Sequence, residues 1–301
     1  MSLAASLSFE TWRSILFVSP LADKHLEKAP LAGADALQLD LEDAIPADRK
    51  IAARERLGPV ITDLRRAGVR DIIVRVNAPW LLAVEDLRAA VAAGADCITL
   101  PKVEGAHRAA VVDTILDEIE DRQAEPLKRT RILIMIESAL GLENLPDILR
   151  ASNRICAVTL GPEDFARDMG TAPTMAANEW ANLAVLAAGR AAGVTPLGFP
   201  GSIALIDDMD RFRAQISRAA ELGFRGAAVI HPKQVAVLNA LFAPTAENLA
   251  EAEHIVFAAQ SSGAGVLVVD GKMVDAPVIE RARALLNRHR ALDLRKEGPK
   301  A

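Results

Sequence analysis

Eight short apolar segments, separated by helical stretches of similar length, dominate this sequence. The segments cover residues 13–20, 36–43, 71–77, 97–102, 131–138, 155–160, 195–199 and 223–232. Glycine or an Ala-Gly pair marks the turns between them, as is typical where a helix ends. Strands that alternate with helices predict parallel strand–helix–strand units, and eight such units predict an α/β fold of the (β/α)8 TIM-barrel type. The first crossover helix does not open with Gly-x-Gly-x-x-Gly, which argues against a doubly wound sheet.

The length of the chain suits one barrel with an appendage. Its 301 residues, of which 51% are hydrophobic, can bury one large core. We expect a TIM-barrel domain over residues 1–235 and a C-terminal extension over residues 236–301, with helices around a hairpin whose tip is Asp270-Gly271. So short an extension has too little core to fold alone. It therefore packs on its own barrel or on a neighbouring subunit, and the second case predicts a homo-oligomer, either a trimer or a hexamer.

Charge and hydropathy exclude several kinds of partner. The net charge is −5 and acids and bases are interspersed, so no nucleic-acid surface is expected. No apolar run reaches the length of about 20 residues that spans a bilayer, and no secretory signal opens the chain. These features predict a cytoplasmic protein without a membrane partner. Cys97 and Cys156 lie in apolar strands, where we expect them to be core residues.

Carboxylates follow two consecutive apolar strands. Residues 131–136 run directly into Glu137, and residues 155–160 run into a turn that carries Glu163 and Asp164. The ends of parallel strands face the open mouth of a barrel, where such enzymes hold their chemistry. Acids at strand ends also cap the helices that follow, which is the structural alternative for a single such residue. Two acids from adjacent strands favour a site of hard oxygen ligands, which suits Mg²⁺, or Mn²⁺, better than zinc.

Arginine interrupts the third strand, and acids end the second. Arg75 stands in an apolar run, where a guanidinium is costly unless it meets an anion. Side chains alternate along a strand, so Asp40 and Glu42 share one face while Asp43 lies on the other. Two interpretations of Arg75 stay open: a buried ion pair with Asp40 or Glu42, or a clamp for the carboxylate of a substrate.

Several short motifs occur in one order along nearly the whole chain. They are Arg13-Ser-x-Leu-Phe-Val, Leu39-Asp-Leu-Glu-Asp43, Val74-Arg-Val-Asn77, Leu100-Pro-Lys-Val-Glu104, Ile136-Glu137-Ser, Gly161-Pro-Glu-Asp164, Ile230-His-Pro-x-Gln234 and Gly271-Lys-Met-Val-Asp275. In these motifs the chain resembles the citrate lyase β-subunit-like branch of the HpcH/HpaI aldolase family, which also holds malyl-CoA and citramalyl-CoA lyases. It departs from the family at residues 18–21, where Pro-Gly is usual, and at residues 226–227, where Gly-Lys is usual.

The resemblance implies roles for residues of the barrel mouth. Glu137 and Asp164 would ligate Mg²⁺, and Arg75 would hold the carbonyl or carboxylate of a 2-oxo acid. Glu42 and Asp43 would orient water around the metal and take part in catalysis.

The remaining residues implied by the resemblance bind substrate or come from another subunit. Arg13 and Lys102 join Arg75 and Glu137 in the substrate-binding set. An acid that matches Asp275 enters the catalytic site from an adjacent subunit in the CoA lyases of this family.

The activity that the resemblance implies is reversible carbon–carbon cleavage. The substrate would be a carboxylated 3-hydroxyacyl thioester of the malyl-, citramalyl- or citryl-CoA type, and the products an acyl-CoA and a 2-oxo acid. Three alternatives stay open: a citrate lyase β subunit that acts on a carrier-bound citryl thioester, a malyl-CoA thioesterase or malate-synthase-like enzyme, and a barrel that binds metal and oxo acid without turnover. Unpaired buried charge argues against the last, because it gives a scaffold no advantage.

Overall fold

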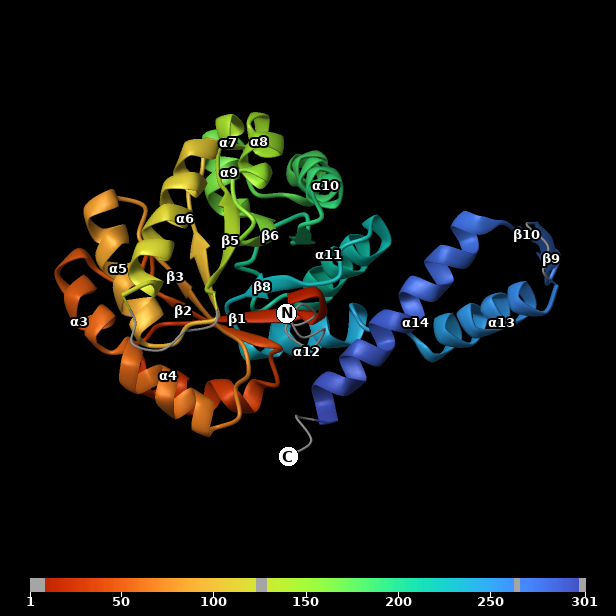
Figure 1. The fold of residues 1–301 in the computed structure, drawn as a ribbon, viewed down its shortest axis with the longest axis horizontal. Helices are drawn as coiled ribbons and strands as arrows, with labels where there is room; N and C mark the ends of the chain where they lie inside the picture. Colours follow the sequence, from red (N-terminus) through yellow and green to blue (C-terminus); the bar gives the residue numbers. More distant parts are fainter. Residues whose placement is uncertain (1–8, 123–128, 263–265, 298–301) are drawn as a thin grey trace.

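The computed structural model describes residues 9–122, 129–262 and 266–297, and it contains the expected barrel (Figure 1). Eight parallel strands form one sheet with helices around it. The strands are β1 (Ser14–Val18), β2 (Ala36–Asp40), β3 (Ile72–Arg75), β4 (Cys97–Leu100), β5 (Arg131–Ile136), β6 (Ile155–Leu160), β7 (Thr195–Leu197) and β8 (Ala227–Val229). The prediction of a (β/α)8 barrel from the alternating pattern is therefore confirmed.

The barrel is nearly closed. Each strand from β1 to β6 pairs with the next one along the chain, and β8 pairs with β1, so β7 and β8 are the two ends of the sheet. Between β7 and β8 the Gly198 N–H donates a hydrogen bond of 2.9 Å to the Gly226 carbonyl, which bridges the two short strands. All eight strands therefore point the same way, and the residues that follow them gather at one end of the barrel.

Helices of varied length surround the strands. The elements before α13 are η1 (Phe9–Thr11), α2 (Asp23–Lys28), η2 (Ala29–Ala32), η3 (Ala47–Arg49), α3 (Lys50–Glu55), α4 (Leu57–Arg66), α5 (Trp80–Ala92), α6 (Ala106–Glu120), α7 (Ala139–Glu143), α8 (Leu145–Arg150), α9 (Pro162–Asp168), α10 (Met175–Ala192), α11 (Met209–Leu222) and α12 (Pro232–Leu241). Proline accounts for two interruptions of the helical stretches. Pro59 cannot donate to the carbonyl four residues earlier, so α3 and α4 are separate, and Pro244 lies between α12 and α13.

The core has two layers. Leu, Ile and Val side chains between strands and helices form the larger one. The smaller one fills the barrel interior and includes Trp12, Ile15, Cys97 and Cys156. Both cysteines are free and buried, so the prediction that they are core residues is confirmed.

The C-terminal extension is an arm that projects from the barrel (Figure 1). It comprises α13 (Ala246–Ser262), β9 (Leu267–Val269), β10 (Lys272–Val274) and α14 (Ala276–Glu297). The strands form the expected hairpin, whose tip residues Asp270 and Gly271 have φ angles of 49° and 76°. The second half of α14 lies on the barrel, where Arg288 donates to the carbonyl of Phe242 at 2.7 Å.

The border between barrel and arm lies after the position predicted for it. Position 235 falls inside α12, which packs against β1 and α11 as part of the barrel. The projecting part begins at α13. Across the ranges that the structure describes, no helix has the length and apolar character needed to cross a bilayer.

Gly226 allows the start of β8 to approach β1 closely. A Cβ atom at this position would lie 1.8 Å from the carbonyl oxygen of Trp12, and backbone on both sides leaves little room to move. We expect Gly226→Ala to lower the free energy of unfolding by about 3 kcal/mol, as severe overpacking does. Urea unfolding measures this change.

The matched control is Gly58→Ala in α4, where an added Cβ would meet no atom within 4 Å. Removing a helical glycine should stabilise the protein by roughly 0.5–1 kcal/mol. Equal stability of the two variants would contradict the close approach of β8 to β1.

Candidate active site

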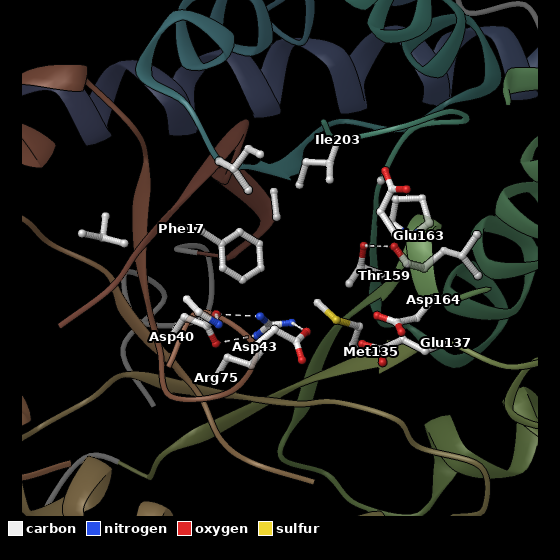
Figure 2. A pocket seen from close by; sticks show the side chains of 18 of the residues that line it. Phe17, Asp40, Asp43, Arg75, Met135, Glu137, Thr159, Glu163, Asp164 and Ile203 are labelled. Carbon is white, nitrogen blue, oxygen red and sulfur yellow. Dashed lines mark hydrogen bonds and ion pairs between the residues drawn. The ribbon is translucent and has the colours of Figure 1, made fainter. Parts of the chain in front are cut away.

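An open cavity of about 540 Å³ lies at the end of the barrel where the strands terminate (Figure 2). Its walls include Phe17 from β1, Arg75 from β3 and Met135 from β5, with residues from the loops after β2, β6 and β7. Parallel strands deliver these side chains to one place although they are far apart in sequence. The cavity is therefore the mouth at which barrel enzymes hold their chemistry.

Arg75 is held in the cavity wall by a buried ion pair. It pairs in register with Asp40 on the neighbouring strand β2, and its Nε and Nη2 atoms donate to the two Asp40 oxygens at 2.7 and 2.6 Å. Burial alone would raise the pKa of Asp40, but the hydrogen bonds and charge of Arg75 outweigh it and lower the pKa. The ion pair expected as one interpretation of Arg75 is thus present. Because Arg75 also lines the cavity, the pair fixes the guanidinium where a ligand can reach it.

Two further acids surround the same guanidinium. Arg75 Nη1 lies 3.1 Å from Glu42 Oε2 and 3.3 Å from Asp43 Oδ2. Lys102 Nζ lies 2.6 Å from the other Glu42 oxygen, and the Lys102 backbone is left-handed with a φ of 54°. Burial raises the pKa of Glu42, although Arg75 and Lys102 oppose the shift. Two cations thus share three carboxylates on this side of the mouth.

Glu137 lies across the mouth and, among the residues that the structure describes, forms no ion pair within 4.0 Å. It follows β5, its side chain is buried, and its Oε2 atom has no hydrogen-bond partner. Burial is the main cause that raises the pKa of Glu137 to about 8; the charges of Glu42 and Asp164 add to the shift, and those of Lys102 and Arg75 oppose it. Gly161 makes room for this side chain, because a Cβ there would lie 2.7 Å from Glu137 Cγ.

Asp164 comes from the first turn of α9 and lines the same cavity (Figure 2). One of its oxygens pairs with Arg167, an exposed residue, at 2.8 Å. Glu137 and Asp164 fit a divalent cation, since a bound cation would satisfy the unpartnered oxygen of Glu137 and relieve the repulsion between the two acids. Within the described part of the chain, no group of three or more His, Cys, Asp or Glu side chains could hold a metal. A two-carboxylate site leaves positions for water and substrate, as Mg²⁺ prefers.

Two of the expected site residues lie away from this cavity, whereas Glu42 and Lys102 adjoin its wall residue Arg75 without lining the cavity themselves. Arg13 precedes β1 and therefore lies at the opposite end of the barrel, where its Nε atom pairs with Asp35 at 2.8 Å. The structure gives Arg13 no place in the substrate-binding set. Asp275 lies on the projecting arm, where its Oδ1 atom accepts a hydrogen bond of 3.4 Å from Val278 N–H at the start of α14. The structure gathers the other six: Arg75, Glu42, Asp43, Lys102, Glu137 and Asp164.

Several cavity residues escaped the sequence analysis although the strand period pointed to some of them. Met135 stands two residues before Glu137, so both side chains leave β5 on the same side. Thr159 likewise stands two residues before Gly161. Ile203 comes from the loop after β7, and no signal in the sequence indicated it.

Comparison with known proteins finds one matching family and relatives that align with most of the chain. Residues 13–232 match the family described as HpcH/HpaI aldolase/citrate lyase. The chain is 35% identical to citrate lyase subunit beta of Escherichia coli K12, over 95% of this chain and 96% of that protein. It is 34% identical to the L-malyl-CoA/beta-methylmalyl-CoA lyase of Cereibacter sphaeroides, over 86% of this chain and 89% of that one.

A solved structure with the same fold contains ligands. The CitE protein of Mycobacterium tuberculosis, in complex with magnesium, acetoacetate and coenzyme A, superposes with a TM-score of 0.73 at 26% identity, over 92% of this chain and 97% of that one. A citrate lyase from Burkholderia xenovorans superposes with a TM-score of 0.80 at 23% identity, over 93% and 92% of the two chains, and confirms the fold.

The raised pKa of Glu137 predicts how metal-free stability depends on pH. In the folded protein the carboxyl keeps its proton up to a pH of about 8, whereas in the unfolded chain it loses the proton near the ordinary pKa of a glutamate, 4.5. The unfolded state therefore binds fewer protons in this window, and the free energy of unfolding falls as pH rises, by at most about 1.4 kcal/mol per pH unit from this group. Glu137→Gln should remove this part of the slope, as measured by urea unfolding in EDTA between pH 5 and 8.5.

Glu163→Gln is the matched control, because Glu163 is an exposed acid of the same cavity. Its slope should remain that of the parent protein. Parallel slopes for Glu137→Gln and the parent would show that Glu137 is ionised throughout this range.

Proposed function

Because the chain belongs to the HpcH/HpaI aldolase/citrate lyase family and is a lyase, we propose that it cleaves a carboxylated 3-hydroxyacyl-CoA reversibly, with Mg²⁺, into an acyl-CoA and a 2-oxo acid. The observation that carries the proposal is the buried Glu137, whose Oε2 atom has no hydrogen-bond partner, with Asp164 in the cavity that Arg75 also lines. The names of the relatives support a malyl-type or a citrate-derived thioester as substrate, and citramalyl-CoA is a further candidate of the same chemical class.

Glu137 and Asp164 would hold the metal. A bound Mg²⁺ supplies a template and a Lewis acid for the carboxylate and adjacent oxygen of the oxo-acid half. Mn²⁺ suits the same oxygen ligands. The raised pKa of Glu137 means that this carboxyl must release its proton before it can act as a ligand.

Arg75 would bind the oxygen at which charge develops. In the cleavage direction the hydroxyl group loses its proton, its carbon becomes the carbonyl carbon of the 2-oxo acid, and the electrons of the broken carbon–carbon bond form the enolate of the acyl-CoA. Protonation of that enolate completes the second product. A positioned donor of this kind lowers the activation free energy by about 3 kcal/mol. The bidentate contact with Asp40 keeps the guanidinium of Arg75 in position.

Asp275 is our candidate for the base that removes the hydroxyl proton. It lies at the start of α14 on the arm and is absent from the wall of its own barrel's cavity. An adjacent subunit would therefore have to supply it, which makes the active form a homo-oligomer. The exposed apolar side chains Phe257, Val268 and Met273 on the arm support contact with another subunit.

A second candidate function differs in the group that carries the acyl chain. Similarity to citrate lyase subunit beta of Escherichia coli over 96% of that protein favours a β subunit that acts on a citryl group bound to an acyl-carrier protein. The active-site roles would be the same, and only the group that delivers the thioester would differ.

A cleavage assay tests the proposed reaction. Purified protein with Mg²⁺ is expected to release glyoxylate, pyruvate or oxaloacetate from malyl-, citramalyl- or citryl-CoA respectively, and to stop doing so in EDTA. Glu137→Gln should abolish turnover because it removes a charged metal ligand. In the same assay Arg75→Lys should lower kcat by about 100-fold, because lysine cannot bind both Asp40 oxygens and the substrate.

Glu143→Gln on α7 and Arg88→Lys on α5 are the controls, since both residues are exposed. Full Mg²⁺-dependent turnover by Glu137→Gln would refute the metal-ligand assignment. Release of free CoA with the cleavage products absent would indicate thioester hydrolysis. Turnover only of a carrier-bound thioester would support the second candidate.

Mixing two inactive variants tests whether Asp275 acts across subunits. Asp275→Asn and Glu137→Gln chains should each be inactive alone. Oligomers reassembled from both should recover part of the activity, because some sites then combine an intact Glu137 with an intact Asp275. The recovered kcat is measured against the ratio of the two chains. Absence of recovery in verified mixed oligomers would exclude a shared site.

A further inference from the structure

A second and larger cavity lies at the base of the barrel, opposite the mouth. It has a volume of about 1400 Å³ and is lined by residues of the barrel on one side and of α13, the hairpin and α14 on the other. Thr11 before β1 and Thr195 at the start of β7 mark the barrel side, so this basal cleft faces the amino ends of the strands. None of the active-site residues described above lines it.

The basal cleft carries an excess of positive charge. Its cations are Arg190, Arg225, Lys272, Arg281, Arg288 and Arg290, and its carboxylates are Glu10, Glu251 and Asp270. Two of these carboxylates already have partners within the arm: Glu251 lies 3.0 Å from Lys272, and Asp270 lies 3.2 Å from His254. Over the ranges that the structure describes, none of the five arginines forms an ion pair within 4.0 Å.

Two of the arginines are fixed by neutral groups. Arg288 donates to the carbonyl oxygens of Phe242 and Arg225 at 2.7 and 2.8 Å, and its Nε atom is buried without a hydrogen-bond partner. Arg225 donates to the carbonyl of Phe224 at 3.0 Å. Carbonyl oxygens orient a guanidinium but do not neutralise it, so the charge remains available to a ligand.

Repulsion among these arginines helps to lower their pKa values. Burial lowers the pKa of Arg288 to about 10, and the positive charge of Arg225 contributes to the shift. Burial also lowers the pKa of Arg225, with Arg190 as the second cause. An anion bound between them would relieve this repulsion.

Nearby acids cannot supply the missing negative charge. Asp35 pairs with Arg13 at 2.8 Å and with Arg295 at 3.6 Å. Asp71 pairs with Arg295 at 2.6 Å and accepts a hydrogen bond from the Trp12 ring at 2.8 Å. Both acids are therefore engaged where the end of α14 meets the barrel. Asp35 offsets part of the shift of Arg288, but the pKa of that guanidinium stays lowered.

We propose that the basal cleft is a second ligand site, which binds a small organic anion through Arg190, Arg225 and Arg288. Guanidinium groups match the geometry of oxyanions, and phosphoryl and carboxylate groups share this chemistry. Apolar side chains such as Ile255 and Leu285 also line the cleft, and they provide contact for the carbon part of the ligand. The site is independent of the lyase chemistry at the mouth.

A bound anion would connect the arm to the barrel. Arg190 and Arg225 belong to the barrel, whereas Arg288 belongs to α14. A ligand that contacts all three therefore lies between these two parts of the molecule. We therefore expect binding to raise the melting temperature of the full-length protein.

The experiment measures binding of two probes to the full-length protein in EDTA. ATP represents phosphoryl anions and citrate represents carboxylate anions, and sodium chloride at matched ionic strength is the reference. Isothermal titration calorimetry and thermal unfolding should detect binding of at least one probe. The probe that binds more tightly identifies the class of the natural ligand.

Arg190→Gln is the decisive variant. Arg190 is exposed, and in the described part of the chain its side chain makes no hydrogen bond or ion pair, so its removal should leave the fold intact. We expect Arg190→Gln to weaken probe binding at least tenfold and to leave cleavage at the mouth unchanged. It should also raise the melting temperature without a probe, because it removes repulsion from Arg225; a residue with a merely structural role would not do this.

Arg281→Gln, at a second exposed position of the cleft, serves as an additional test, and Arg150→Gln, an exposed arginine on α8, is the matched control. The proposal is overturned if neither probe stabilises the protein more than chloride does, or if Arg190→Gln and Arg150→Gln bind a probe equally. It is also overturned if the cleft variants change only the oligomeric state, since the cleft would then be a contact between copies of the chain.

Discussion

The ion pair between Arg75 and Asp40 is the interaction on which the arrangement of the mouth depends. It joins β2 to β3 at a position where the strand register places the two residues side by side. Removing one partner of such a buried pair typically costs about 3–5 kcal/mol, because the other charge is then left alone. The pair also sets the local charge balance, since Arg75 and Lys102 are shared among carboxylates on one side. On the other side, the buried Oε2 atom of Glu137 has no hydrogen-bond partner, and a bound cation would satisfy it.

The two ends of the barrel carry opposite charge imbalances: the mouth has too few cations and the base too few anions. At the mouth, carboxylates outnumber the cations that hold them, and burial keeps the pKa of Glu137 high. At the base, arginines outnumber the acids, and burial lowers the pKa of Arg288. Both imbalances are energetically unfavourable in the ligand-free chain, and both are relieved by an ion of the opposite sign. The same physical argument that indicates a cation at one end therefore indicates an anion at the other.

The sequence was sufficient for the fold and for much of the mouth. Regular alternation of strands and helices predicted the barrel, and acids at the ends of β5 and β6 predicted Glu137 and Asp164. For Arg75 the ion pair and the substrate clamp stayed open, because periodicity along one strand does not reveal the register of its neighbour. Arg13 was assigned to the site although it precedes its strand, and position alone placed it at the base. The short helices α7, α8 and α9 carry too few residues for a helical period to be recognised.

The helices and the hairpin of the arm were predicted from the sequence, but how the arm packs was not, because its own buried cluster is small. Val269, Val274 and Ile279 form its buried cluster, while α14 reaches back to the barrel through Arg288 and Arg295. One continuous helix of 22 residues thus runs from the Asp275 cap to the base of the barrel, a length of about 33 Å. The two proposed roles therefore lie at opposite ends of this helix. An anion in the basal cleft would fix the end of α14 that carries Arg288 to the barrel, while Asp275 at the other end would serve a neighbouring mouth without needing that anion.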